Sequence, residues 1–121
     1  MLAYVTLGTN DLPKAIAFYE KLLGSLGAKR VFESDRGVAW GTGTMSPGLG
    51  VVKPFDEKPA TRGNGTMVAL AVDSNDKVDA LYKLAMSLGA TDEGKPGPRE
   101  GFYAAYFRDL DGNKLNVCCM S

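Results

Sequence analysis

Hydrophobic and polar residues follow the same order twice along the chain: a short alternating stretch, a polar turn and then a helical stripe. In the first half, residues 4–7 alternate and residues 8–11 are turn formers. Residues 12–26 then carry hydrophobic side chains at the i, i+3, i+4, i+7 spacing of an amphipathic helix. These side chains are Leu12, Ala15, Ile16, Tyr19, Leu22, Leu23 and Leu26. The pattern predicts a strand followed by a helix.

The ends of this helix carry suitable capping residues. Asn10 or Asp11 is suited to cap its start, and Pro13 to its first turn. Gly27 is suited to the position after its last residue.

The second half repeats the order. Residues 67–70 alternate, residues 73–76 offer turn and cap chemistry, and residues 77–88 form a second helical stripe. Its hydrophobic positions are Val78, Leu81, Tyr82, Ala85 and Leu88. The tetrapeptide Ser-Leu-Gly-Ala ends both helical regions, at residues 25–28 and 87–90. We interpret the chain as two copies of one unit.

Short strands with turn residues between them follow each helix. In the first half we expect them at residues 28–33, 37–42 and 48–53, and in the second near Thr91, at 102–108 and at 113–119. The glycine-rich residues 93–101 are predicted to be a loop, and residues 109–113 a hairpin turn whose carboxylates serve the turn rather than a metal. The organisation is therefore one α+β domain over residues 1–121. Unit one covers about 1–57, a linker about 54–65, and unit two about 64–121.

Composition narrows the possible functions. Lys and Arg number 14, as do Asp and Glu, so the formal net charge is zero and neither nucleic acid nor an anionic membrane is an expected partner. Histidine, the commonest ligand for zinc and iron, is absent.

Cys118 and Cys119 are adjacent, so we expect reduced thiols rather than a disulfide. The N-terminus shows no basic or long hydrophobic segment, and we expect a cytoplasmic protein.

Several segments together resemble the glyoxalase / bleomycin-resistance / dioxygenase superfamily, also called vicinal oxygen chelate proteins. They are Tyr-Val-Thr-Leu-Gly at 4–8, Asn-Asp-Leu at 10–12, Ala-Phe-Tyr at 17–19, residues 65–72 and residues 106–117. The resemblance implies paired βαβββ units that form a curved, open-barrel mixed sheet around a cavity, with the helices outside. It also implies a homodimer.

The same resemblance indicates where a metal would bind. Its ligands come from the first and last strands of each unit, which places them at Tyr4, Met67, Asn116 and a position on or next to Gly50. Phenol, thioether and amide are poor ligands for a divalent ion, and glycine has no side chain to offer. We therefore expect neither a family-type metal site nor another cofactor.

Strand alternation and the resemblance together give a set of candidate ligand-binding residues: Tyr4, Thr6, Trp40, Met67, Arg99, Tyr103, Asn116 and Cys118. Three of these positions have an alternative. Trp40 is equally suited to core packing, Arg99 also fits a solvated loop charge, and Tyr103 and Tyr106 cannot both face inward on a regular strand.

These residues favour metal-independent binding of a small aromatic or amphipathic molecule, as in a sequestration or resistance protein. One alternative is a lyase or isomerase of the glyoxalase type with a non-standard site. Another is a non-catalytic structural or interaction domain whose cavity is filled by its own side chains.

Overall fold

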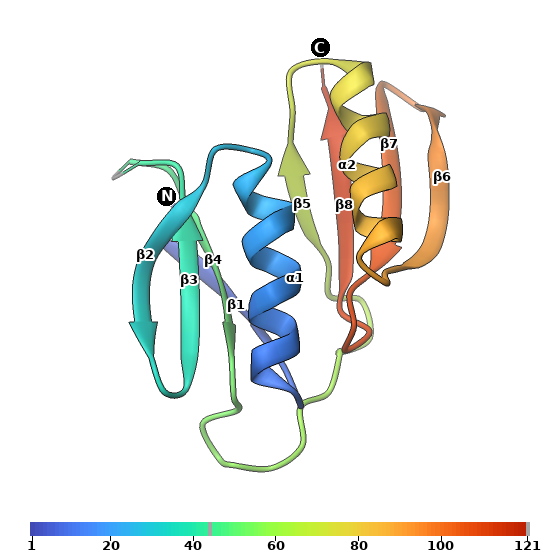
Figure 1. Ribbon diagram of the computed structural model, residues 1–121. Helices are drawn as coiled ribbons and strands as arrows, with labels where there is room; N and C mark the ends of the chain where they lie inside the picture. The colour runs from blue at the N-terminus through green and yellow to red at the C-terminus, as the bar shows by residue number, and fades with distance from the viewer. Residues whose placement is uncertain (44, 121) are drawn as a thin grey trace. The chain divides into compact units, whose positions relative to one another are not determined.

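In the computed structural model, which describes residues 1–43 and 45–120, one βαβββ order occurs twice (Figure 1). The contacts divide the chain into two compact units, Met1–Arg62 and Gly63–Ser121. The first contains β1 (Tyr4–Gly8), α1 (Leu12–Gly24), β2 (Lys29–Ser34), β3 (Gly37–Gly41) and β4 (Gly48–Val52). The second contains β5 (Val68–Ala71), α2 (Asn75–Ser87), β6 (Thr91–Arg99), β7 (Phe102–Arg108) and β8 (Lys114–Cys119).

Each unit forms its own four-stranded mixed sheet with one helix packed against it. The strand orders are β1-β4-β3-β2 and β5-β8-β7-β6, so the two sheets share one topology. The first and last strands of each unit pair in parallel, β1 with β4 and β5 with β8, and the other neighbours are antiparallel. The predicted α+β class with a duplicated βαβββ unit is confirmed.

The repeated Ser-Leu-Gly-Ala sequence is the C-terminal cap of each helix. In α1 the amide of Ala28 donates to the carbonyl of Leu23, and in α2 the amide of Ala90 donates to the carbonyl of Ala85. The glycine between them adopts a positive φ in both caps, 84° at Gly27 and 101° at Gly89. Only a residue without a Cβ adopts that conformation readily, which explains why both copies keep glycine there.

Each helix also begins with a side-chain cap. Asp11 accepts a hydrogen bond from the amide of Lys14, and Ser74 accepts one from the amide of Lys77. The buried residues of α1 are Leu12, Ala15, Phe18, Tyr19, Leu22 and Leu23, and those of α2 are Val78, Leu81 and Ala85. Helix α1 ends at Gly24, two residues before its expected end, because the cap itself occupies the next residues.

The predicted loop at residues 93–101 is wrong, since Thr91–Arg99 forms strand β6. Pro96 and Pro98 are tolerated because β6 is an edge strand of its sheet, and its register with β7 shifts twice. The guanidinium of Arg99 donates to the carbonyls of Lys95, Gly97 and Pro98, which gives this irregular strand side-chain partners in addition to its ladder.

The turn at residues 109–113 matches its predicted role. The carboxylate of Asp109 accepts hydrogen bonds from the amides of Asp111 and Asn113 and from the side chain of Asn113. Gly112 has a φ of 88°. The turn carboxylate is thus engaged in local hydrogen bonds.

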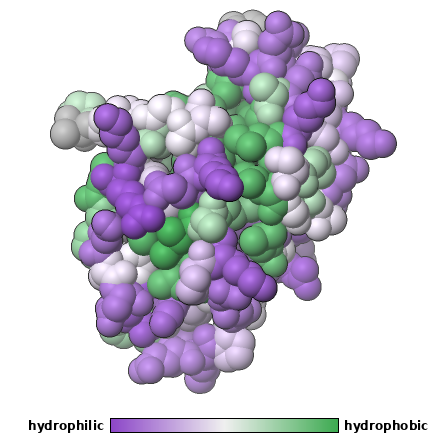
Figure 2. Space-filling view, in the orientation of Figure 1, coloured by the Kyte–Doolittle hydropathy of each residue, from purple (hydrophilic) through white to green (hydrophobic). Residues whose placement is uncertain are grey.

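The molecular surface is mixed in character. On the face seen in Figure 2, hydrophilic side chains cover much of the surface and hydrophobic ones show between them. Neither helix in the described part of the chain is long and apolar enough to cross a membrane.

Candidate functional site

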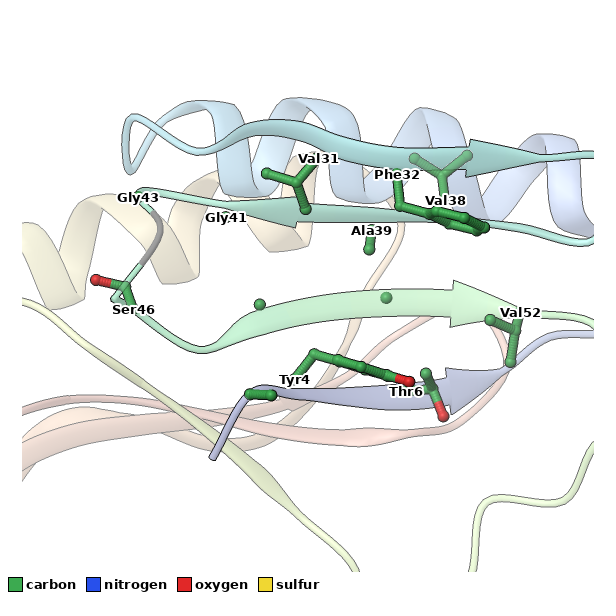
Figure 3. Close-up of a pocket in the computed structure, with 13 residues that line it drawn as sticks. Tyr4, Thr6, Val31, Phe32, Val38, Ala39, Gly41, Gly43, Ser46 and Val52 are labelled. Atoms are coloured by element: carbon green, nitrogen blue, oxygen red, sulfur yellow. The ribbon is translucent and has the colours of Figure 1, made fainter. Parts of the chain in front are cut away.

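A groove of about 630 Å³ lies on the face of the first sheet that is turned away from α1 (Figure 3). Strand register decides which residues reach this face. Thr6, Gly50 and Ala39 are aligned across β1, β4 and β3. The next row, Val5, Leu49 and Trp40, is on the opposite face because neighbouring residues of a strand alternate. The groove lies entirely within the first unit, and we refer to it as the sheet A groove.

The floor of the sheet A groove consists of glycines. Gly41, Gly48 and Gly50 line it, and none of them has a positive φ. A Cβ added at Gly50 would meet Ala39 Cβ at 3.4 Å and Thr6 Cγ2 at 3.6 Å, which is ordinary contact. Neither backbone conformation nor crowding therefore requires glycine at this position. What the glycine provides is open space above the sheet.

One wall of the sheet A groove depends on a β-bulge. Arg30 pairs with Trp40 and Phe32 pairs with Ala39, so Val31 is an extra residue in β2. The bulge lets Val31 and Phe32, two consecutive residues, both line the groove. Both are largely exposed, 64% for Val31 and 60% for Phe32. Sequence alternation could not indicate this wall, because a bulge interrupts the period of two.

The opposite wall is formed by Tyr4 and Thr6 of β1, two of the predicted site residues. Tyr4 is 67% exposed despite its large ring. The polar side chains on the groove are the hydroxyls of Tyr4, Thr6 and Ser46, and no charged residue lines it within residues 1–43 and 45–120. The lining residues are Ala3, Tyr4, Thr6, Val31, Phe32, Val38, Ala39, Gly41, Gly43, Ser46, Gly48, Gly50 and Val52.

The matching face of the second sheet carries large side chains where the first carries glycine and alanine. Tyr106 pairs with Asn116 as Ala39 pairs with Gly50. The ring of Tyr106 has the Arg99 guanidinium 5.4 Å and the Lys114 ammonium 5.5 Å from its centroid. The open floor of the sheet A groove therefore comes from its residues and is not imposed by the βαβββ fold.

Trp40 lies on the helix side of its sheet. It is 1% exposed, and its ring centroid is 6.1 Å from that of Tyr19 in α1. Its indole Nε1 donates a hydrogen bond to Glu20 Oε2 at 2.9 Å. Of the two roles that the sequence allowed, the structure shows core packing.

The choice of Tyr103 as the inward tyrosine of β7 is wrong. Its hydroxyl donates to Asp79 of α2 at 2.7 Å, which places Tyr103 on the helix side of the second sheet. Tyr106 is on the opposite face, aligned with Asn116. The hydrogen bond to Asp79, followed by a smaller desolvation effect, raises the pKa of Tyr103 above its ordinary value and so favours the neutral phenol.

The remaining predicted residues all belong to the second unit. Met67 directly precedes β5 and is partly exposed, whereas Asn116 and Cys118 of β8 are buried. The Asn116 amide donates to the carbonyls of Ala105 and Val117. Burial, followed by the neighbouring thiol of Cys119, raises the pKa of Cys118, which does not favour a reactive thiolate.

Comparison with known proteins gives a consistent assignment. The profile of the Glyoxalase/Bleomycin resistance protein/Dioxygenase superfamily matches residues 1–117. The chain belongs to this superfamily. No curated protein matches it.

Solved structures of glyoxalase-superfamily proteins share the fold over essentially the whole chain. A glyoxalase/bleomycin resistance protein from Albidiferax ferrireducens T118 is 33% identical, with a TM-score of 0.92, covering 100% of this chain and 99% of that one. Lactoylglutathione lyase from Agrobacterium tumefaciens is 21% identical, with a TM-score of 0.72 and coverage of 98% and 92%. A fosfomycin resistance protein from Mesorhizobium loti is 22% identical, with a TM-score of 0.70 and coverage of 100% and 92%. The last two show likeness of fold alone.

The residues at the superfamily's metal positions do not fit a metal ion. Gly50 has no side chain, Met67 supplies only a thioether, and the amide nitrogen of Asn116 is engaged with two carbonyls. Tyr4 supplies only a phenol, a poor ligand for a divalent ion. In the part of the chain that the structure describes, no three His, Cys, Asp or Glu residues are grouped as metal ligands.

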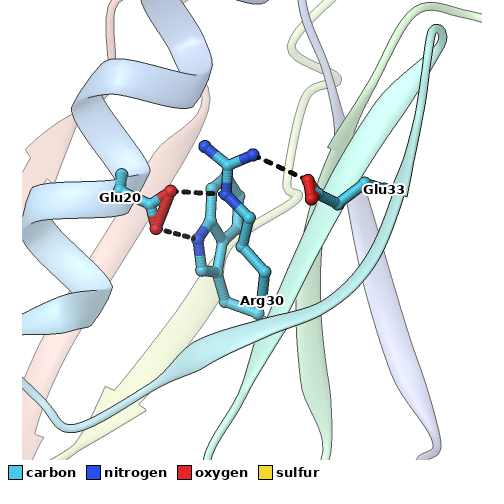
Figure 4. A network of polar contacts seen from close by, with 4 residues as sticks. Glu20, Arg30 and Glu33 are labelled. Atoms are coloured by element: carbon cyan, nitrogen blue, oxygen red, sulfur yellow. Dashed lines mark hydrogen bonds and ion pairs between the residues drawn. The ribbon is translucent and has the colours of Figure 1, made fainter.

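A polar network ties β2 and β3 to α1 on the helix side of the first sheet (Figure 4). Glu20 accepts hydrogen bonds from Trp40 and from Arg30, and Arg30 also binds Glu33. The bond from Trp40, followed by that from Arg30, lowers the pKa of the Glu20 carboxyl below its ordinary value. The network therefore stabilises the ionised form of Glu20.

This network predicts a pH-dependent stability difference. A carboxyl with a lowered pKa stabilises the fold fully above its unfolded pKa, and this contribution disappears as the pH falls through the folded pKa. We expect Glu20→Gln to lower the urea midpoint at about pH 7 and the difference from wild type to shrink towards about pH 3. Urea unfolding across that range measures it, and a difference that stays constant would contradict the network's role.

Proposed function

We propose that this protein binds a small aromatic or amphipathic molecule in the sheet A groove, without a metal ion. The observation that carries the proposal is the glycine floor. The same scaffold position is bare at Gly50 in the first unit and occupied by Asn116 in the second. An open apolar groove between aromatic walls is a surface that favours ring-shaped ligands.

The groove chemistry suits binding more readily than catalysis. Its hydroxyls, from Tyr4, Thr6 and Ser46, can orient a ligand by hydrogen bonds. No His, Cys, Asp, Glu or Lys is among its described lining residues to move a proton near neutral pH. The structurally similar proteins named as a lyase and as a fosfomycin resistance protein support the alternative of a glyoxalase-type enzyme only through the shared fold. A homodimer and a cytoplasmic location stay predictions.

Binding by metal-depleted protein tests the proposal. Protein dialysed against a chelator should bind naphthalene-2-methanol, a two-ring probe, with an affinity that added divalent cations leave unchanged. We expect Tyr4→Ala to weaken binding about tenfold because it removes one aromatic wall. Isothermal titration calorimetry measures both effects.

The matched control is Met67→Ala, the corresponding position of the second unit, which should leave the affinity unchanged. Two results would contradict the proposal: binding that requires added metal, or a Tyr4→Ala protein that binds as tightly as wild type. If probe binding competed with self-association, sedimentation velocity would identify a second copy of the chain as the occupant instead.

A further inference from the structure

Two charged side chains of the first sheet, those of Arg30 and Glu33, lie away from the sheet A groove. Arg30 is aligned with Trp40, a residue of the helix side, and its guanidinium donates to Glu20 and to Glu33. The bulge at Val31 separates Arg30 from Phe32, so that the charge falls on one face and the ring on the other. The groove is consequently an uncharged surface, although β2 carries Lys29, Arg30 and Glu33.

Lys29 is the charged residue of β2 whose register brings it nearest to the groove. It pairs with Gly41 at the start of β2, but it is exposed and does not line the groove. A ligand lying on the floor would therefore meet backbone, apolar side chains and three hydroxyls.

The strand order sets the width of the groove. Tyr4 is on β1 and Phe32 on β2, the two edge strands, with β4 and β3 between them. Three intervals of about 4.8 Å separate the edge strands by roughly 14 Å. With glycine at the centre, a fused two-ring system has room to lie flat on the peptide planes of the floor.

Given the proposed function, on which this inference rests, we infer that the ligand of the sheet A groove is uncharged and planar. A charged group placed on this floor loses hydration and finds no opposite charge among the described lining residues. A neutral ring loses little hydration and gains the apolar walls. Because its described lining residues include no charged side chain, the groove favours neutral ligands. Its hydroxyls remain available to one neutral polar substituent.

Three probes with one ring system separate charge from shape. They are naphthalene-2-methanol, which is neutral, 2-naphthoate, which is an anion, and 2-naphthylmethylammonium, which is a cation. We expect wild-type protein to bind the neutral probe at least about tenfold more tightly than either ion at neutral pH. Raising the salt concentration should leave the affinity of the neutral probe unchanged.

A charge placed in the groove should reverse this preference. Thr6→Lys positions an ammonium on the wall and should favour 2-naphthoate over the neutral probe. The matched control is Ala69→Lys, because Ala69 pairs with Asn116 in the second unit as Thr6 pairs with Gly50 in the first. This control should keep the wild-type order of affinities.

The outcomes distinguish this inference from the proposed function. If wild-type protein binds an ion as tightly as the neutral probe, charge selection is overturned and aromatic binding stands. If that ion is the anion 2-naphthoate, loss of its binding in Lys29→Met would identify Lys29 as the counter-charge. If wild-type protein binds none of the three probes, the proposed function and this inference both fail. The wild-type series decides the matter even if Thr6→Lys does not fold.

Discussion

Gly50→Leu should abolish most ligand binding while leaving the protein folded. The new side chain would rise from the centre of the floor, where the nearest neighbours of an added Cβ are at 3.4 Å and further. If the probe loses roughly 100 Å² of apolar contact at about 25 cal/mol per Å², the cost is roughly 2.5 kcal/mol, or about a 70-fold weaker affinity. Calorimetric titration with naphthalene-2-methanol measures this loss.

Stability should change little in the same variant. The φ of Gly50 is not positive, so a leucine adopts the same backbone conformation, and the second unit already carries a side chain at the matching position, Asn116. We expect the free energy of unfolding to stay within about 1 kcal/mol of wild type. The control is Gly24→Leu at the end of α1, where an added Cβ meets nothing within 4 Å. Wild-type affinity in Gly50→Leu would place the ligand elsewhere.

Trp40→Ala should destabilise the fold severely, and Phe32→Ala should not. Trp40 is fully buried against α1, and its removal leaves a cavity and takes the indole donor from Glu20. Such truncations cost about 3–5 kcal/mol. Phe32 is on the groove side, so its truncation should change the free energy of unfolding by no more than about 0.5 kcal/mol. Urea unfolding of the two variants measures the difference.

Ligand binding should depend on Phe32 and not on Trp40. Phe32→Ala removes an aromatic wall and should weaken binding of the naphthalene probe. For Trp40 the binding test uses Trp40→Phe, which keeps the core filled more fully than alanine does, and this variant should leave the affinity of the folded protein unchanged. Equal stability losses in Trp40→Ala and Phe32→Ala would contradict the assignment of these two rings to opposite faces.

Local signals in the sequence were sufficient for the helices and for the duplication. The repeated Ser-Leu-Gly-Ala tetrapeptide fixes two caps through short-range hydrogen bonds and a positive φ at Gly27 and Gly89, and none of this depends on distant residues. The strand pairs in the antiparallel hairpins follow similarly from turn residues such as Gly112. The fold class was therefore predictable from local chemistry and its repetition.

The face on which each strand residue lies was harder to predict. Alternation tells which residues share a face, but it does not tell whether that face is turned towards the helix or away from it. In β7, Ala104, Ala105 and Phe107 are all buried, so burial on both faces gave no signal to choose between Tyr103 and Tyr106. The bulge at Val31 resets the alternation of β2, which hid Phe32 as a wall residue. Such a bulge is set by the pairing of two strands and has no local signature here.

Strand β6 was predicted only near Thr91, and its continuation to Arg99 was missed for a different reason. Its glycines and prolines are typical of loops. The side chains that pack against this strand and stabilise it come from elsewhere in the unit. A Cβ at Gly94 would lie 3.0 Å from the ring of Tyr106 and 3.3 Å from Arg99 Nη2, so glycine there leaves room for both side chains. The spacing Gly48-Leu49-Gly50 in β4 did contain a usable signal, since two glycines at a separation of two expose one face of a strand.

The most direct test of metal-free binding in the sheet A groove is the amide NMR spectrum of chelator-treated protein titrated with naphthalene-2-methanol. Ring currents of a bound probe should shift the amides of Gly41, Gly48 and Gly50 in proportion to occupancy, while Tyr106 and Asn116 in the second unit stay unperturbed. Shifts confined to the second unit, or shifts that appear only after a divalent cation is added, would contradict the account.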